Sequence, residues 1–109
     1  MKSATPRATR VAVPTKATLK KYGLTVETWQ AILDRQGGGC GACGLVPRSG
    51  RLNVDHQHVR GYKAMLPWQR ANYVRGLLDY GCNSKRLSRG ATVENLRGAA
   101  DYLERYRNR

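Results

Sequence analysis

The chain has 109 residues, with 20 Lys and Arg against seven Asp and Glu, and a formal net charge of +13 at neutral pH. This length predicts one domain with a modest core, and three cysteines with no long apolar stretch argue against a disulfide framework, a signal peptide or a membrane span, so we expect a cytoplasmic protein. The charge is spread along the chain and predicts nucleic acid as the partner, since an anionic membrane would require a long basic amphipathic helix.

The N-terminal segment is rich in Pro, Thr, Ala and Arg and shows no periodicity. We interpret residues 1–17 as a flexible basic arm and residues 18–109 as the folded domain. The arm either tethers phosphates or is simply a disordered terminus.

A first amphipathic helix is predicted after Thr25, which is a plausible N-cap. Three consecutive glycines, Gly37 to Gly39, end it. The residues on its apolar side, which we expect in the core, are Val26, Trp29, Ile32 and Leu33.

Two short motifs with matched spacing, Cys40-x-x-Cys43 and Asp79-x-x-Cys82, indicate a metal site. In such a site each pair forms a tight turn, and the metal joins the two turns. Aspartate stands where a fourth cysteine is expected, but a carboxylate oxygen is an accepted zinc ligand. We therefore predict a structural zinc ion bound by Cys40, Cys43, Asp79 and Cys82. The alternative, buried free cysteines and a solvated aspartate, does not account for the matched spacing.

Two short strands are predicted between these motifs. Residues 51–55 alternate polar and apolar side chains, so Leu52 and Val54 should point inward and the strand should present Asp55 and His56 at a loop. Residues 74–78 form the second strand, which leads into the second metal motif. A helix is predicted from Asn83 to Leu87, with Gly90 after it.

The connector over residues 59–73 interleaves cationic and aromatic side chains. This composition suits a nucleic-acid surface, and it equally suits a loop that folds its aromatic rings onto the domain's own core. We assign no specific base contact to it.

The last helix is predicted from Thr92 as N-cap, and it is amphipathic. Its apolar side either covers the domain's own core or meets the same helix of a second subunit. The residues on that side are Val93, Leu96, Ala100, Leu103 and Tyr106.

Asp55, His56 and Asn83 form a second constellation with different chemistry. Carboxylate and amide oxygens are hard donors suited to magnesium or manganese, and an imidazole can take a proton from water near neutral pH. The predicted zinc would hold Asn83 in place because Asn83 directly follows Cys82. Together these groups would allow in-line hydrolysis of a phosphodiester.

Three motifs together resemble the phage recombination endonuclease VII family, a branch of the HNH or ββα-metal (His-Me finger) nucleases. The resemblance covers residues 19–106, and the motifs are Cys40-x-x-Cys43, Val54-Asp55-His56-x-His58, and Val74-Arg75-Gly76-Leu77-Leu78 followed by Cys82-Asn83. It implies an α+β fold, namely a small zinc-stabilised ββα-metal domain flanked by N- and C-terminal helices.

The resemblance also implies roles for individual residues. His56 would be the general base, Asp55 and Asn83 would bind Mg²⁺ or Mn²⁺, and His58 would position or polarise the scissile phosphate or the metal. The family's usual substrate is branched DNA such as Holliday junctions, cut by a homodimer in the host cytoplasm during phage DNA processing. The sequence departs from the family pattern at Asp79, where a third cysteine is usual, and in the longer connector over residues 59–73.

Two functions follow from these observations. The first is a metal-dependent DNA endonuclease that resolves junctions or nicks DNA. The second is a non-catalytic zinc module that binds DNA through its charge, with the Asp-His-x-His segment serving only the structure.

Overall fold

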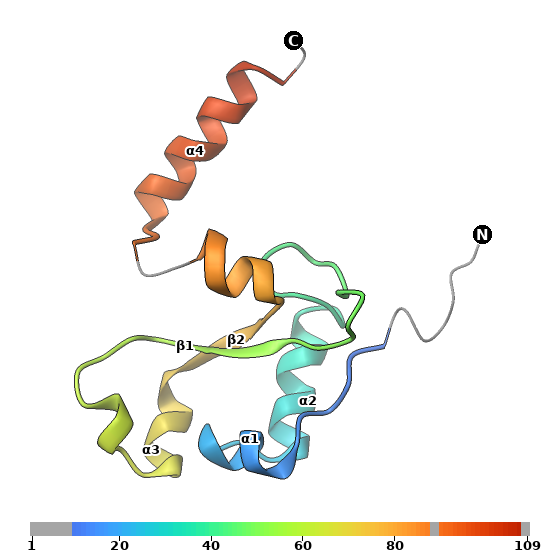
Figure 1. Ribbon diagram of the computed structural model, residues 1–109, viewed down its shortest axis with the longest axis vertical. Helices are drawn as coiled ribbons and strands as arrows, with labels where there is room; N and C mark the ends of the chain where they lie inside the picture. Colours follow the sequence, from blue (N-terminus) through green and yellow to red (C-terminus); the bar gives the residue numbers. More distant parts are fainter. Residues whose placement is uncertain (1–9, 88–89, 108–109) are drawn as a thin grey trace.

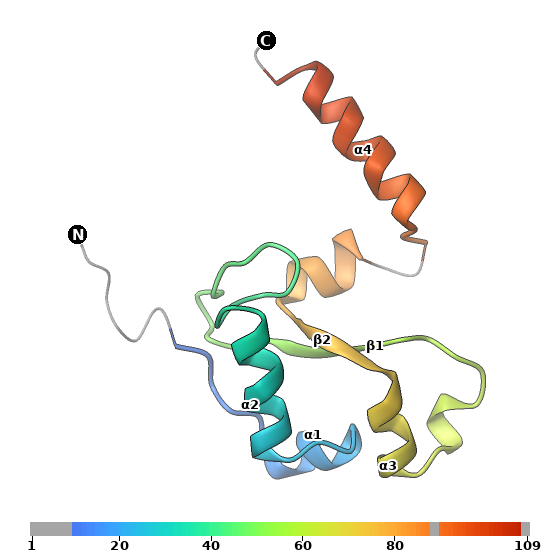
Figure 2. The ribbon, with the colours of Figure 1, turned by 180° about the vertical axis from the view of Figure 1, so that it is seen from behind.

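The computed structural model describes residues 10–87 and 90–107 and shows a small α+β architecture (Figure 1). In chain order, its helices and strands are α1 (Lys16–Lys21), α2 (Val26–Arg35), β1 (Asn53–His56), the 3₁₀ turn η2 (Tyr62–Ala64), α3 (Pro67–Arg70), the 3₁₀ turn η3 (Ala71–Tyr73), β2 (Val74–Leu78), the π-helical turn η4 (Cys82–Arg86) and α4 (Val93–Arg105). Figures 1 and 2 show α1, α2 and α3 gathered on one side of the strands, while α4 projects away on the other. No helix in the described ranges is both long and apolar enough to cross a membrane.

The two strands form an antiparallel pair in which Asn53 lies opposite Leu78. The second strand is confirmed over residues 74–78. The first runs from Asn53 to His56 instead of over residues 51–55, because β2 ends at Leu78 and offers no partner to residues 51 and 52. Leu52 and Val54 are buried, as predicted.

The predicted first helix is confirmed as α2, and it packs against β2. The Thr25 side chain accepts a hydrogen bond from the Thr28 N–H, while the Thr28 hydroxyl accepts one from the Thr25 N–H, so both ends of this capping box are satisfied. Trp29 is fully buried, and Ile32 and Leu33 join it in the core. The prediction was wrong for Val26, which is 47% exposed.

Val26 is exposed because it is the first residue of α2 and lies over an open groove between α1 and α3 instead of over the sheet. Gly23, just after α1, lets α3 lie close to the chain at this point. A Cβ on Gly23 would lie 2.1 Å from the Pro67 carbonyl oxygen, and the residue has a positive φ of 71°.

Gln36, the residue after α2, pairs with strand β2 as a further peptide group would. Its Nε2 donates to the Leu77 carbonyl at 2.9 Å, and its Oε1 accepts from the Leu77 N–H at 2.8 Å. The Nε2 also donates to the Gly39 carbonyl at 2.9 Å. The amide fits because Gly76 has no side chain, and a Cβ there would lie 2.7 Å from the Oε1. Gln36 thus fastens the end of α2 to the sheet.

Replacing Gln36 by Ala is expected to lower the free energy of unfolding by about 1–3 kcal/mol, because the N–H of the fully buried Leu77 loses its partner. Gln30→Ala is the matched control, since Gln30 makes an exposed contact with Asp34 on the same helix. Urea unfolding of both variants tests this. Equal stability of the two variants would contradict the role given to Gln36.

Residues before position 18 already pack against the domain. Residues 1–9 of the predicted arm lie outside the described residues. Val11 lies in the core with 9% of its surface exposed, and the Ala12 N–H donates to the Gly50 carbonyl at 2.7 Å. Helix α1 then starts at Lys16 with Thr15 as its N-cap. The folded domain therefore includes part of the segment predicted as an arm.

The last helix, α4, forms as predicted, and its Thr92 N-cap accepts a hydrogen bond from the Asn95 N–H at 3.0 Å. The helix has no buried residue. Its apolar residues are exposed, Leu103 by 68% and Leu96 by 39%. Figure 2 shows that it does not lie against the rest of the domain. It therefore does not cover the domain's own core, which is one of the two roles considered above.

Candidate metal centre and histidine pocket

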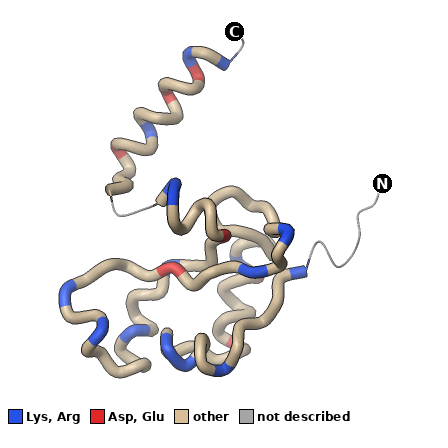
Figure 3. Tube along the Cα trace, in the orientation of Figure 1, with Lys and Arg blue, Asp and Glu red and all other residues tan. Residues whose placement is uncertain are grey.

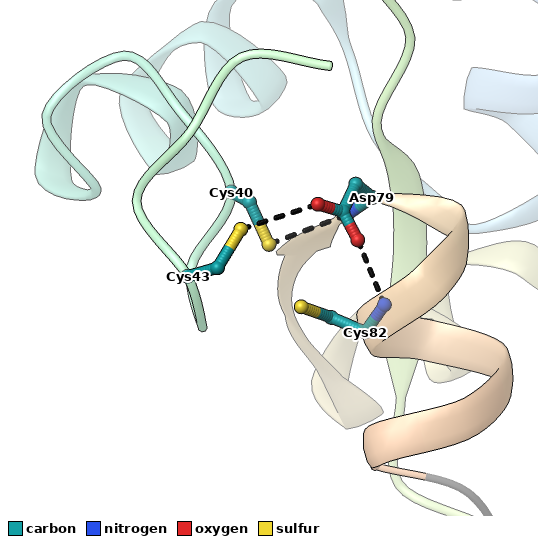
Figure 4. Close-up of side chains that lie close together, drawn as sticks. All are labelled: Cys40, Cys43, Asp79 and Cys82. Atoms are coloured by element: carbon teal, nitrogen blue, oxygen red, sulfur yellow. Dashed lines mark hydrogen bonds between the residues drawn. The ribbon is translucent and has the colours of Figure 1, made fainter. Parts of the chain in front are cut away.

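The four residues predicted to bind zinc come together in the structure. One ligand atom from each of Cys40, Cys43, Asp79 and Cys82 lies within 4.8 Å of the others. Figure 4 shows the side chains converging from two segments, the loop after α2 and the turn after β2. Cys40 and Cys82 are buried while Cys43 is exposed, so the cluster lies at the edge of the core. Three sulfurs and one carboxylate fit a tetrahedral zinc ion.

Asp79 is oriented by its own turn. Its Oδ1 accepts a hydrogen bond from the Cys82 N–H at 2.7 Å, and its Oδ2 lies 3.2 Å from the Cys43 Sγ, which donates to it. These two donors hold the pKa of the Asp79 carboxyl below its usual value. The carboxylate therefore caps the η4 turn with one oxygen and presents the other to the sulfurs.

The backbone also supports the sulfur of Cys40. The N–H groups of Ala42 and Asp79 both donate to it, each at 3.4 Å. Because Ala42 and Asp79 belong to the two different turns, this sulfur already links them without an ion.

Arg86 supplies a positive charge at the cluster, a contact that the sequence interpretation missed. Its Nη1 donates to the Cys82 Sγ at 3.2 Å. Burial raises the pKa of the Cys82 thiol to about 11, so a metal that binds there must displace its proton. Three thiolates and one carboxylate would exceed the charge of a zinc ion, and the Arg86 guanidinium offsets part of that excess. The sequence does contain a signal for this contact: Arg86 follows Cys82 by four residues, and this spacing places two side chains on the same side of a helical turn.

Replacing Asp79 by Cys is expected to retain or tighten zinc binding, because thiolate is the softer donor and a sulfur can still accept the Cys82 N–H, as Cys40 does for its neighbours. Zinc content and competition with a chromophoric chelator measure this. Asp79→Ala is the control and should bind zinc more weakly than the parent. Weaker binding by Asp79→Cys than by Asp79→Ala would show that residue 79 is not a ligand.

His56 ends strand β1 and lies at the mouth of an open pocket. The lining residues are His56, His58, Val59, Gly61, Tyr62, Lys63 and Ala64. The Tyr62 ring stacks on the imidazole with centroids 4.1 Å apart and planes 12° from parallel. The His58 ring lies 4.9 Å away. Partial burial and the neighbouring His58 lower the pKa of His56, so its imidazole is neutral near pH 7 and has a lone pair that can accept a proton.

Asp55 is held by an arginine that was not among the predicted site residues. The Arg75 Nε donates to Asp55 Oδ2 at 2.8 Å, and its Nη2 donates to Oδ1 at 3.1 Å. Only 8% of the Asp55 surface is exposed. A buried carboxylate requires such a partner, and the two-pronged contact is the strong form of this ion pair.

Asn83 lies in the η4 turn directly after Cys82, and its backbone N–H donates to the Asp79 carbonyl at 2.9 Å. This hydrogen bond ties Asn83 to the turn that carries Asp79 and Cys82. Shared coordination of one ion by Asp55 and Asn83 stays a prediction, as does the role of His58. Asp55 and His56 are consecutive on β1, and of the two His56 lines the pocket.

The connector over residues 59–73 folds part of its side chains onto the domain, and its role as a nucleic-acid surface stays a prediction. Tyr62 turns inward onto His56, and burial raises the pKa of its hydroxyl. Arg70 is structural, because its guanidinium donates to the carbonyls of Lys21 and Lys63, each at 3.0 Å. Trp68 instead is 66% exposed, beside the groove between α1 and α3.

Figure 3 shows how the charged residues are distributed along the chain. Lys and Arg recur along α1, the connector and the loops, whereas three of the chain's seven acidic residues, Glu94, Asp101 and Glu104, lie on α4. The domain that carries the site is therefore more strongly positive than the helix that projects from it.

Fold and site together define a small α+β protein with a two-stranded sheet. A cluster suited to a metal ion lies where β2 ends, and His56 at the end of β1 lines a separate pocket. Comparison with known proteins is more specific. The chain belongs to the recombination endonuclease VII family, whose model matches residues 15–105.

The chain also has a relative among phage proteins. The chain is 37% identical over 89 residues to the Gene 59 protein of Mycobacterium phage D29, and the match covers 80% of this chain and 47% of that protein. The chain thus spans about half the length of this curated relative. No solved structure gives a significant match.

Proposed function

We propose that the chain is a metal-dependent DNA endonuclease of the HNH, ββα-metal type, which hydrolyses phosphodiester bonds in branched DNA or introduces nicks. Membership of the recombination endonuclease VII family supports a nuclease. The observation that carries the catalytic assignment is the placement of His56, a neutral imidazole at the open end of β1 and next to a carboxylate.

The order of elements supports the ββα-metal assignment. Two antiparallel strands, β1 and β2, are followed by the short helical turn η4. In this proposal the zinc cluster is structural, because its ligands flank the sheet and the turn instead of lining the histidine pocket. Zinc would fix the direction in which η4 leaves β2, and with it the position of Asn83.

The residues proposed to hold a catalytic ion are Asp55 and Asn83, whose oxygens are the donors that Mg²⁺ and Mn²⁺ prefer. When bound, such an ion would stabilise negative charge on the departing oxygen of the phosphodiester. His56 would accept the proton of the attacking water, and Tyr62 would keep its ring in place by stacking. His58, whose ring is 4.9 Å from that of His56, would position or polarise the scissile phosphate or the metal.

The proposed partner is duplex or branched DNA, bound on the positive face around the pocket. We propose a homodimer formed through the exposed apolar side of α4, since that side has no cover within the described part of the chain. A phage relative is consistent with action in the cytoplasm of a host cell.

Binding to DNA is expected to weaken steeply as salt rises, because each neutralised phosphate releases counterions. For a protein with a net charge of +13, a plot of the logarithm of the binding constant against the logarithm of the salt concentration should fall with a slope of several units between about 50 and 200 mM salt. Fluorescence anisotropy with a labelled duplex measures the slope. A flat response would contradict an electrostatic interface.

The experiment that tests the function compares cleavage of a synthetic four-way junction with cleavage of a linear duplex of the same sequence, in Mg²⁺ or Mn²⁺. Faster cleavage of the junction would support a junction-resolving enzyme, and equal rates would support a nicking enzyme. Binding without cleavage under any divalent ion would favour the other candidate, a zinc module that binds DNA through its charge.

A further inference from the structure

Arg75 binds Asp55, one of the two residues proposed to hold the catalytic ion. We propose that the Arg75 side chain has two alternative partners. It neutralises the Asp55 carboxylate in the DNA-free protein, and it moves to a DNA phosphate when substrate binds. This proposal rests on the proposed function. The transfer frees the carboxylate oxygens for the divalent ion. Arg75 is thus a positioning residue that couples metal binding to DNA binding.

The first observation is that both Asp55 oxygens are engaged. Two guanidinium nitrogens donate to them, at 2.8 and 3.1 Å, and the Asp55 side chain is only 10% exposed. A carboxylate this buried needs a cation, and in the DNA-free protein that cation is Arg75. A divalent ion approaching Asp55 would meet the same two oxygens and the repulsion of the guanidinium. Its affinity for the free protein should therefore be low.

The second observation is that the Arg75 side chain is free to move away from Asp55. In the strand register, Asp55 lies opposite Gly76 and His56 lies opposite Val74, so Arg75 occupies a β-bulge without a partner on β1. Its side chain is 50% exposed, and its described hydrogen bonds are those to Asp55 alone. Rotation of this side chain would break these two described hydrogen bonds, which a phosphate can replace. Bulges commonly redirect a side chain beside a functional site.

The third observation is the position of the guanidinium. It is paired with Asp55, the residue directly before His56 on β1, and the bulge that carries Arg75 lies opposite the step from Asp55 to His56. A phosphate held beside His56 for attack would therefore lie within reach of Arg75. Phosphate accepts the same two-pronged contact that the carboxylate accepts now, so the exchange keeps the guanidinium paired.

The consequence is reciprocal coupling. If DNA draws Arg75 away from Asp55, DNA binding must raise the affinity for the divalent ion by the same factor as the ion raises the affinity for DNA. The free protein would then take up little metal at the catalytic site, and the site would be completed when a phosphate is present.

The test measures Mn²⁺ binding by electron paramagnetic resonance, which reports free Mn²⁺. The chain carries His56→Ala so that DNA stays intact, and it is titrated with and without a short duplex. Without DNA, adding Arg75→Gln is expected to tighten Mn²⁺ binding about tenfold, a factor typical of coupled sites. Arg60→Gln is the matched control, because it removes one charge from an exposed position in the connector and should change affinity by less than about twofold.

Duplex DNA is expected to tighten Mn²⁺ binding about tenfold in the Arg75-containing chain and to have little effect in Arg75→Gln. Equal Mn²⁺ affinity of the two chains without DNA would overturn the proposal, as would an equal effect of DNA on both. Asp55→Asn should abolish the site. If Asp55→Asn binds Mn²⁺ as tightly as the chain with Asp55, the proposed ion site at Asp55 is wrong.

A second measurement needs no variant at position 75. The Nε–H resonance of Arg75 in a ¹⁵N spectrum is expected to shift when the duplex and Mg²⁺ are added together. A resonance that stays unchanged would overturn the proposal. Failure of the proposed function is seen separately, as absence of cleavage by the parent, because these binding readouts do not depend on hydrolysis.

Discussion

Replacing His56 by Ala is expected to lower the rate of DNA cleavage by about two orders of magnitude or more, while DNA binding persists. His56 ends β1 and lines the pocket, and the Ala variant has no imidazole at that position to accept the proton of the attacking water. In the proposed function the phosphate contacts come from Lys and Arg, whose charges the change keeps. Initial rates on a supercoiled plasmid and on a four-way junction measure the loss.

Gln57→Ala is the matched control. Gln57 is adjacent and exposed, and its fixed contact is a backbone hydrogen bond from its N–H to the Tyr73 carbonyl at 2.7 Å, which the change keeps. Its cleavage rate should stay within about twofold of the parent. Cleavage by His56→Ala at the parent's rate would eliminate the assignment of the general base.

Removing the metal from the cysteine cluster is expected to abolish cooperative folding. Structural zinc contributes roughly 10–16 kcal/mol in small domains at neutral pH, whereas the whole stability of a domain is about 5–15 kcal/mol. Two of the ligands, Cys40 and Cys82, belong to the core itself, so loss of the ion disturbs the same residues that pack against Trp29 and Leu77. Thermal unfolding before and after treatment with a strong chelator measures the effect.

Cys82→Ser should reproduce the loss, because it removes a fully buried ligand. Ser84→Ala, an exposed change in the same η4 turn, should leave both zinc content and melting temperature near those of the parent. A purified parent that contains no zinc and still unfolds cooperatively would refute the structural role of the cluster.

Local patterns in the sequence predicted several parts of the fold correctly. Helix α2 could be predicted because its apolar residues repeat with the period of a helix and Thr25 caps its start. The metal cluster could be predicted because the same spacing occurs twice, in Cys40-x-x-Cys43 and in Asp79-x-x-Cys82. In both cases the signal lies within a few neighbouring residues.

The contacts that escaped prediction join single polar residues far apart in the chain. Gln36 pairs with a strand residue 41 positions away, and Arg75 pairs with Asp55 across 20 positions. Neither residue stands out locally, because a glutamine at a helix end and an arginine in a strand are both ordinary at exposed positions. Tyr62 is a similar case, because its stacking on His56 depends on how the connector folds back.

The thirteen residues of α4 make up a helix of three to four turns that gains nothing from burial. An isolated helix of this length is only marginally stable in water. Whatever surface eventually covers its apolar side must therefore also supply the free energy that keeps it helical. Affinity for that surface is reduced by this ordering cost, and a substitution such as Arg97→Gly, which weakens the helix on its polar side, would weaken association all the same.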